Sequence, residues 1–253
     1  MSPPFDLSRP NRKIHAGVIL LNSTTEILDI APFHIMGGLS DRAEDLPDDA
    51  WPRAMKDQAM DIECHWVNES GKPAQLTAGM SLNPTDTFDT CPPLDIVLMG
   101  ANKMDYTPTP AELDFVRKSH DSCSAFIAVC GAFNTLLLAG LLEGKTATAP
   151  PILLKTLREE HPRVTWLNKR WHQDGKIWTT GTLVNGLDAM RAFVLQTWGG
   201  QGGFAEFLLR TGNWPKRDVD YRDVKIDEGR HRVTELLWGR SLNLEVMATY
   251  IQI

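Results

Sequence analysis

Residues 124–151 read SAFIAVCGAFNTLLLAGLLEGKTATAPP, and this stretch decides the fold. Residues 125–129 form a short apolar run with the length of a buried strand, and residues 131–140 have the length and composition of a helix. Gly144 then turns the chain into a second short run, KTATA, which predicts another strand. The stretch therefore predicts a strand, a sharp turn, a helix and a strand, with Cys130 at the turn.

The same alternation continues on both sides of this stretch. We predict further strands at residues 15–21, 61–68, 95–99 and 176–180, with another strand or edge ribbon within residues 75–84. We predict helices at residues 28–40, 110–120, 151–161, 184–198 and 204–210. Because strands alternate with helices, the predicted fold is α/β, a parallel sheet sandwiched between helices on both faces.

The domain organisation follows from composition along the chain. Residues 1–13 are polar and hold three prolines, which predicts a flexible tail. Residues 14–200 form the α/β domain, within which the charged and irregular stretch 41–60 lies outside the core. Residues 201–253 follow the break GGQGG and form a C-terminal helical extension that packs on the domain or on a second subunit.

The overall composition excludes several classes of protein. Hydrophobic residues make up 42% of the 253 residues and charged residues 23%, so a disordered or fibrous chain is excluded. The net charge of −6 argues against a nucleic-acid binder, which needs a basic stripe. The chain begins without the apolar segment of a signal peptide, and it has no apolar run of about 18 residues. We expect a cytoplasmic protein with no membrane partner.

Four cysteines, Cys64, Cys91, Cys123 and Cys130, are too few for a disulfide scaffold. None of them forms a CxxC pair, and no Cys/His cluster has the spacing of zinc ligands. We therefore expect neither a metal nor a cofactor.

Cys130 occupies a chemically special position. A residue between a strand and a helix stands at the carboxyl edge of the sheet, where open α/β sheets hold ligands. The helix N-terminus favours a thiolate and can lower the cysteine pKa from about 8.5 to about 3.5–7.5. The Gly131 N–H can face a developing negative charge, and Gly100 and Ala101, which end a neighbouring strand, can supply a second backbone donor. The pattern alone does not distinguish this reactive cysteine from a buried structural one. We interpret the other three cysteines as structural or incidentally exposed.

Four segments in order carry a resemblance to a known family. They are VILLNSTTEILDIAP, LDIVLMGAN, AVCGAFNTLLLAGLLEGKTAT and DGKIWTTGTLVNGLDAMRAFV. Together they resemble the DJ-1/PfpI superfamily, which is related to class I glutamine amidotransferases, over roughly residues 14–200. Within it, the chain is most similar to the isonitrile hydratase-like branch, particularly its fungal relatives. The resemblance implies a flavodoxin-like fold with Cys130 in a nucleophile elbow, a small-molecule substrate and a homodimer.

The resemblance also assigns a proton partner to the cysteine. Asp29 matches the acidic residue that lies beside the family cysteine and exchanges a proton with it, although its position also suits a helix cap or a first-turn charge. Asp188 matches a family position that we take as structural.

The chain departs from the family pattern at two places. Many relatives have a histidine shortly after the elbow helix, where this chain has Ala-Thr-Ala-Pro at residues 147–150, and hydratase relatives often have a threonine where Gly131 stands. The first departure makes peptidase, glutaminase and glyoxalase-like chemistry less plausible. Whether His34 or His172 assists Cys130 is left open.

The sequence is compatible with three functions. The first is a cysteine-dependent hydratase, lyase or hydrolase of a compact electrophile such as an isonitrile, which uses Cys130 and Asp29. The second is a redox or stress-response protein in which Cys130 is oxidised. The third is a pocket scaffold or cyclase for a natural-product intermediate, in which the cysteine is incidental.

Overall fold

The fold is taken from a computed structural model of the chain, which describes residues 5–40, 47–49, 51–103, 105–200 and 202–224. Its central element is a seven-stranded sheet with the order β11-β12-β8-β7-β1-β3-β6. The strands, in that order, are Trp171–Asp174, Ile177–Thr180, Ala125–Ala128, Ile96–Met99, Ile14–Ile19, Ile62–Asn68 and Asp86–Thr87. All neighbouring pairs are parallel except β11 with β12. The expectation of an α/β fold built on a parallel sheet is confirmed.

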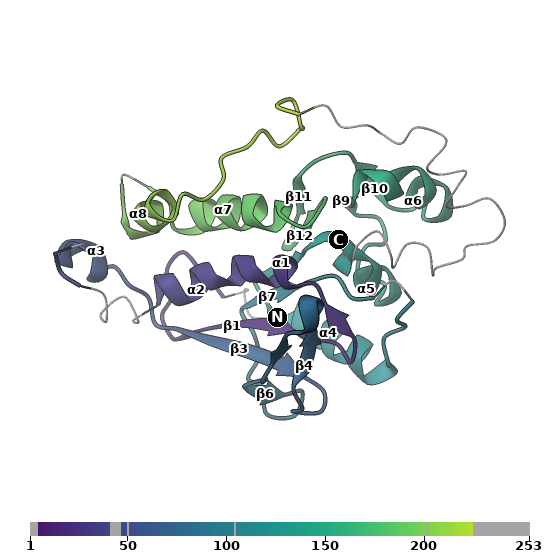
Figure 1. The fold of residues 1–253 in the computed structure, drawn as a ribbon, viewed down its shortest axis with the longest axis horizontal. Helices are drawn as coiled ribbons and strands as arrows, with labels where there is room; N and C mark the ends of the chain where they lie inside the picture. The colour runs from purple at the N-terminus through teal and green to yellow at the C-terminus, as the bar shows by residue number, and fades with distance from the viewer. Residues whose placement is uncertain (1–4, 41–46, 50, 104, 201, 225–253) are drawn as a thin grey trace.

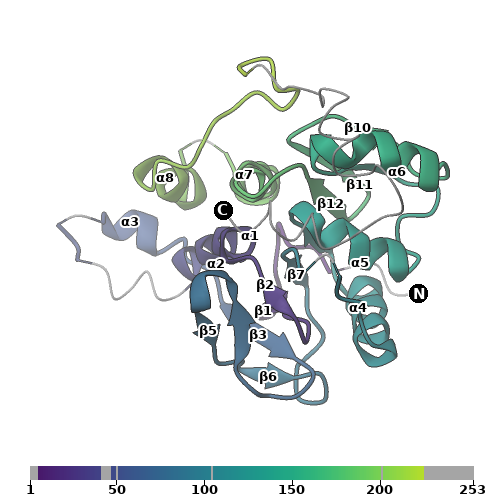
Figure 2. The same ribbon diagram turned by 45° about the vertical axis from the view of Figure 1, so that its right-hand side comes forward.

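Helices cover both faces of this sheet (Figures 1 and 2). They are α1 Ile27–Ile30, α2 His34–Leu39, α3 Arg53–Lys56, α4 Pro110–Ser122, α5 Phe133–Leu138, α6 Leu154–Glu160, α7 Asn185–Trp198 and α8 Phe204–Thr211. Short 3₁₀ turns occupy Ala31–Phe33, Thr77–Gly79, Cys130–Ala132 and Pro151–Leu153. Figure 2 shows α7 and α8 on one side of the sheet and α4 and α5 on the other.

Two hydrophobic cores result from the alternation of side chains along the strands. In β1, Ala16 and Val18 enter the core shared with α1, α2, α7 and α8, whereas Ile19 enters the core shared with α4, α5 and α6. Residues of β7 and β8 are buried on both faces because these strands lie in the middle of the sheet. The carboxyl ends of β7 and β8 therefore open onto a well-packed edge, where Gly100 and Cys130 follow.

The smaller strands compare with the sequence-based expectation in different ways. The run KTATA forms β9, Thr146–Thr148, but it pairs with β10, Thr165–Leu167, in a separate two-stranded sheet beside α6 (Figure 1). Strand β11 was not expected; it forms an antiparallel hairpin with β12 through Gly175, whose φ is 60°. The expected ribbon at residues 75–84 is present, with β4, Ala74–Leu76, between β2, Thr24–Thr25, and β5, Ser81–Leu82.

The prediction of a flexible tail over residues 1–13 is wrong for residues 5–13, and residues 1–4 lie outside the described residues. Leu7 is buried, and its carbonyl accepts a hydrogen bond of 2.7 Å from the Trp198 indole N–H. The Arg12 guanidinium lies over the Phe5 ring and makes two hydrogen bonds of 2.7–2.8 Å to the buried Asp95 carboxylate. Residues 5–13 are thus part of the packed domain.

Two other stretches were expected to be peripheral. Within residues 41–60, residues 41–46 and 50 lie outside the described part, whereas helix α3 buries Lys56, which pairs with Asp48 at 2.6 Å. Within residues 201–253, α8 packs against α2, α3 and α7 as an extension on the domain, and residues 213–224 follow without a helix. The rest of that expected extension, residue 201 and residues 225–253, lies outside the described residues.

Among the residues that the structure describes, no helix has the length and apolar character required to span a membrane.

The docking of residues 5–13 can be tested through Arg12. We expect Arg12→Gln to lower the free energy of unfolding by about 1–2 kcal/mol, because the buried Asp95 carboxylate loses its two guanidinium hydrogen bonds and keeps only its bond from the His15 N–H. Urea denaturation measures this change, with the exposed Arg9→Gln as a matched control. Equal stability of the two variants would show that the segment does not contribute to the fold.

Candidate functional site

Cys130 sits at a sharp turn between β8 and the helical turn that leads into α5. Its φ is 53°, a left-handed conformation that costs energy for any residue other than glycine and occurs at nucleophile elbows. The Cys130 N–H donates a hydrogen bond of 3.0 Å to Thr180 Oγ1 at the end of β12, which holds the turn in place. A Cβ atom added to Gly131 would lie 3.1 Å from the Ala101 Cβ, so the ends of β7 and β8 are in close contact here.

Asp29 lies in α1, next to the same edge, and its side chain is fully buried. Its Oδ2 atom accepts a hydrogen bond of 2.8 Å from the Ala101 N–H. Its Oδ1 atom is buried without any hydrogen-bond partner among the described residues. Ala101 thus contacts both sides of the site, with its N–H on Asp29 and its methyl group against Gly131.

The protonation of Asp29 follows from this environment. Burial raises the pKa of Asp29 well above its ordinary value, the Ala101 N–H opposes this shift, and the charge of Glu26 adds to it. The raised pKa favours the protonated carboxyl, which can act as a proton donor.

The pKa of Cys130 differs from the sequence-based expectation of a stabilised thiolate. Burial raises the pKa of the Cys130 thiol above its ordinary value, and the negative charges of Asp29 and Glu26 add to the shift. The backbone N–H groups of Gly131 and Leu183 hydrogen-bond to the sulfur and lower its pKa, but the other effects are larger. The expected low pKa is therefore wrong: with the side chain 5% exposed, loss of hydration outweighs the helix N-terminus.

The two groups behave as a coupled acid pair. A negative charge on Asp29 makes ionisation of Cys130 harder, so a state with both groups ionised is disfavoured. The resemblance to the family implied this pairing of Asp29 with Cys130, and the structure brings both residues to one buried edge.

The backbone donors are arranged differently from the expectation. The Gly131 N–H, expected as a donor to an oxyanion, acts on the Cys130 sulfur and lowers its pKa. The Ala101 N–H, expected as a donor to an oxyanion, is instead bound to Asp29. Gly100 provides space, because a Cβ atom there would lie 2.9 Å from the Asp29 Cβ.

Three functional neighbours were missed by sequence reasoning. Glu26 is buried, accepts hydrogen bonds from the Thr77 hydroxyl and the Leu28 N–H, and acts on both members of the pair. Thr180 is the last residue of β12 and Leu183 lies in the loop that follows, both within the segment TTGTL. The signal available for them was their place after a strand that ends at the same sheet edge as β8.

A network of polar side chains fixes the loop that carries Leu183. Asn185 Oδ1 accepts hydrogen bonds from the Thr182 N–H at 2.9 Å and the Tyr221 hydroxyl at 2.7 Å. Asp188 accepts a hydrogen bond from the Asn185 amide at 3.1 Å and pairs with Arg217 at 2.9 Å. Asp188 therefore ties α7 to residues 213–224, which accords with the structural role expected for it.

No histidine among the described residues shifts the pKa of Cys130 in place of the one common in relatives. Ala149, in the stretch where relatives have it, is fully buried. The charged groups that act on the Cys130 pKa, Asp29 and Glu26, are both acids. His34 is exposed on α2, and the charges that act on His172 in β11 are those of Lys169 and Asp174. The described residues give neither histidine a place in the site.

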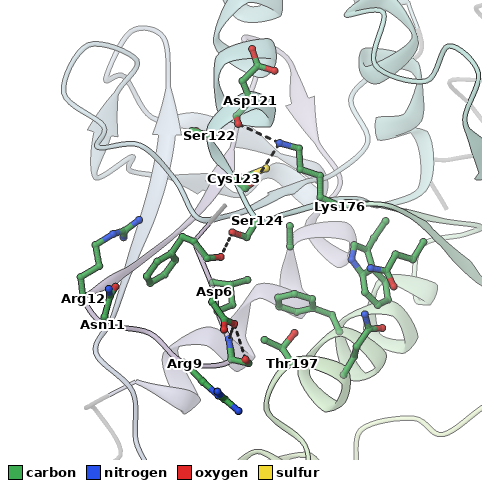
Figure 3. Close-up of a pocket in the computed structure, with 18 residues that line it drawn as sticks. Asp6, Arg9, Asn11, Arg12, Asp121, Ser122, Cys123, Ser124, Lys176 and Thr197 are labelled. Carbon is green, nitrogen blue, oxygen red and sulfur yellow. Dashed lines mark hydrogen bonds between the residues drawn. The ribbon is translucent and has the colours of Figure 1, made fainter. Parts of the chain in front are cut away.

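A wide cavity of about 1400 Å³ lies elsewhere (Figure 3). It is lined by Cys123, Ala125 and Lys176, at the amino ends of β8 and β12, whereas Cys130 follows the carboxyl end of β8. Figure 3 shows the Lys176 ammonium directed at the end of α4, where it donates hydrogen bonds to backbone carbonyls that include those of Asp121 and Cys123 at 3.3 Å. Lys176 thus caps a helix, and this cavity is separate from the Cys130 site.

The buried acid makes stability depend on pH in a defined direction. An unfolded Asp29 has a pKa of about 3.9, and the folded value is raised. The stabilisation is complete below the unfolded pKa and is lost as pH rises towards the folded one, because the unfolded chain then binds fewer protons. We expect urea denaturation from about pH 4 to pH 7 to show Asp29→Asn gaining stability over the wild type, by up to about 1.4 kcal/mol per pH unit.

The exposed Asp6→Asn variant is the control, because hydrogen bonds from Ser8 lower the pKa of Asp6. Its titration therefore falls below about pH 4, and its stability should run parallel to that of the wild type over the measured range. Parallel stability curves for Asp29→Asn and the wild type would contradict a raised pKa at Asp29.

Comparison with known proteins places this arrangement in a family. The DJ-1/PfpI family model matches residues 50–197, which include Cys130 but not Asp29. An isonitrile hydratase from Pseudomonas putida is 32% identical over 133 residues, which are 51% of this chain and 56% of that protein. The match thus spans little more than half the length of that relative.

Two solved structures share the fold. A THiJ/PfpI family protein from Pseudomonas syringae aligns with a TM-score of 0.68 and 19% identity, covering 94% of this chain and 91% of that one. DJ-1beta from Drosophila melanogaster aligns with a TM-score of 0.57 and 14% identity, covering 81% of this chain and 100% of that one. The family model matches more than half of the chain, and the mostly parallel sheet and the cysteine at the sharp turn agree with it. The chain therefore belongs to the DJ-1/PfpI family.

Proposed function

We propose that this protein hydrates a compact electrophile of the isonitrile class, with Cys130 as nucleophile and Asp29 as proton donor and acceptor. The observation that carries the proposal is the buried Asp29 carboxyl, whose Oδ1 atom has no partner among the described residues and whose pKa is raised beside the Cys130 thiol. The 32% identity to an isonitrile hydratase supports the choice of substrate class.

The reaction balances with these two groups and one water. Asp29 donates its proton to the terminal carbon of R–N≡C while the Cys130 sulfur bonds to the same carbon, and the thiol proton passes to the Asp29 carboxylate. The product is a thioimidate, R–N=CH–S–Cys. Water then adds to the C=N bond and a proton reaches nitrogen, after which the C–S bond breaks to give the formamide R–NH–CHO and the free thiol.

The surroundings of Cys130 suit this sequence of steps. A neutral acid is needed first, and the raised pKa of Asp29 favours the protonated carboxyl. The N–H groups of Gly131 and Leu183 stabilise negative charge that develops on the sulfur. The lack of a histidine among the groups that act on the thiol disfavours the Cys–His chemistry of peptidases and amidases.

The competing functions are less well supported by the same contacts. Oxidation of a sensor cysteine proceeds through an accessible thiolate, whereas Cys130 is 5% exposed and its pKa is raised. An incidental cysteine in a scaffold does not require the left-handed φ of 53° that the turn maintains. A homodimer, which the family resemblance implies, stays a prediction.

The test uses a simple alkyl isonitrile and measures the formamide product by chromatography. We expect Cys130→Ser and Asp29→Asn each to lower kcat by at least about 100-fold, because each removes a group that bonds to or protonates the reacting carbon. Cys91→Ser is the matched control and should retain turnover, since Cys91 Sγ donates a hydrogen bond to the adjacent Pro92 carbonyl and does not act on the Cys130 thiol.

Normal turnover in Cys130→Ser would contradict the proposal and favour the scaffold function, in which the cysteine is incidental. A second outcome would favour the redox function. The wild type and all variants would then form no formamide, and mass spectrometry would show selective sulfenic or sulfinic oxidation of Cys130 in dilute peroxide.

A further inference from the structure

A second cluster of chemically active side chains lies on strands β1 and β3, away from Cys130. His15, Glu63 and His65 each present one donor atom, and the three atoms lie within 4.8 Å of one another. His15 and Glu63 are near the amino ends of their strands, whereas Cys130 follows the carboxyl end of β8 in the same parallel sheet. The cluster is therefore distinct from the candidate active site and independent of its function.

The strand register explains why the three side chains meet. His15 lies opposite Glu63 and Gly17 lies opposite His65, so all four positions share one face of the sheet. Gly17 has no side chain, and a Cβ atom there would lie 2.6 Å from the Leu94 side chain. The His15 Nδ1 and His65 Nε2 atoms are 3.0 Å apart, and Glu63 Oε2 lies 3.9 Å from His15 Nδ1.

Asp86 determines which nitrogen of His65 is available. Its Oδ2 atom lies 2.8 Å from His65 Nδ1, and because a carboxylate only accepts, Nδ1 carries the proton. In the neutral ring the His65 Nε2 atom then presents a lone pair towards His15. A carboxylate behind a histidine in this way is the usual outer support of a metal-binding imidazole.

We propose that His15, Glu63 and His65 bind a divalent first-row transition metal, for which Zn²⁺ is the ion tested. Two imidazoles and one carboxylate are a donor set that Zn²⁺ uses in proteins, with water in the remaining position. Two nitrogens that are each about 2.1 Å from one ion are separated by about 3.0–3.4 Å at ordinary bond angles. The observed separation of 3.0 Å therefore fits with little movement of the rings.

The surroundings of the cluster determine how an ion would reach it and which side chain competes with the ion. The side chains of His15 and Glu63 are 24% and 49% exposed, so an ion can reach them from solvent. The Lys13 ammonium lies 3.1 Å from Glu63 Oε2 and competes with a metal for that carboxylate. The neighbouring Arg12 is held by Asp95. A bound ion would bridge β1 and β3 and stabilise the folded chain.

The experiment measures the affinity of the full, chelator-stripped chain for Zn²⁺ by competition with a chromophoric chelator. We expect one Zn²⁺ per chain in the wild type, with affinity at least about 10-fold lower in His15→Gln and His65→Gln. Zn²⁺ should also raise the Tm of the wild type and not that of His15→Gln. His172→Gln, which changes a half-buried histidine of β11, and Cys91→Ser, which removes a partly buried thiol, are the controls and should bind as the wild type does.

Lys13→Gln should change the Zn²⁺ affinity in the opposite direction. Removing the competing ammonium should tighten Zn²⁺ binding several-fold, an effect that a loss of stability cannot produce. Because His65 is buried, circular dichroism checks that His65→Gln folds; if it does not, the partly exposed positions His15 and Lys13 decide the result. Equal Zn²⁺ affinity of the wild type and His15→Gln, or loss of binding only in Cys91→Ser, would overturn the proposal.

Discussion

The hydrogen bond from the Ala101 N–H to Asp29 Oδ2 is the contact on which the candidate site depends. It connects the end of β7 to α1 and holds a carboxyl group in a fully buried position. Burial without a cationic partner favours the neutral acid, since an isolated buried carboxylate is poorly solvated. This backbone contact fixes the position of Asp29, whereas burial, whose effect the contact opposes, raises its pKa.

The same contact explains the character of Cys130. Because Asp29 and Glu26 are the charged groups that act on the thiol, ionisation of the sulfur is opposed, and the N–H groups of Gly131 and Leu183 only partly compensate. A buried thiol with a raised pKa reacts slowly with reagents from bulk solvent, because little of it is present as thiolate. Residues 213–224 contribute at a distance, because Tyr221 and Arg217 fix the loop from which Leu183 reaches the sulfur.

Much of the fold and the position of Cys130 could be predicted from the sequence, because apolar runs of strand length alternate with helices and the turn at Cys130 follows the plainest of these runs. The pairing of Asp29 with Cys130 came from resemblance, since the residues are a hundred positions apart and share no periodicity. The hairpin of β11 and β12 was missed although Asp174–Gly175 is a turn signal. The docking of residues 5–13 was missed because single contacts such as Arg12 with Asp95 leave no pattern in a polar segment.

The expected low pKa of Cys130 was wrong for a reason that sequence cannot supply, namely the degree to which neighbouring elements exclude water. The most direct test is therefore the pH dependence of the alkylation rate of Cys130, followed by mass spectrometry in the wild type and in Asp29→Asn. The account predicts a thiol pKa above about 8.5 in the wild type and a lower one in Asp29→Asn, where the carboxylate charge is absent. A thiolate already formed near neutral pH, or the same pKa in both proteins, would contradict it.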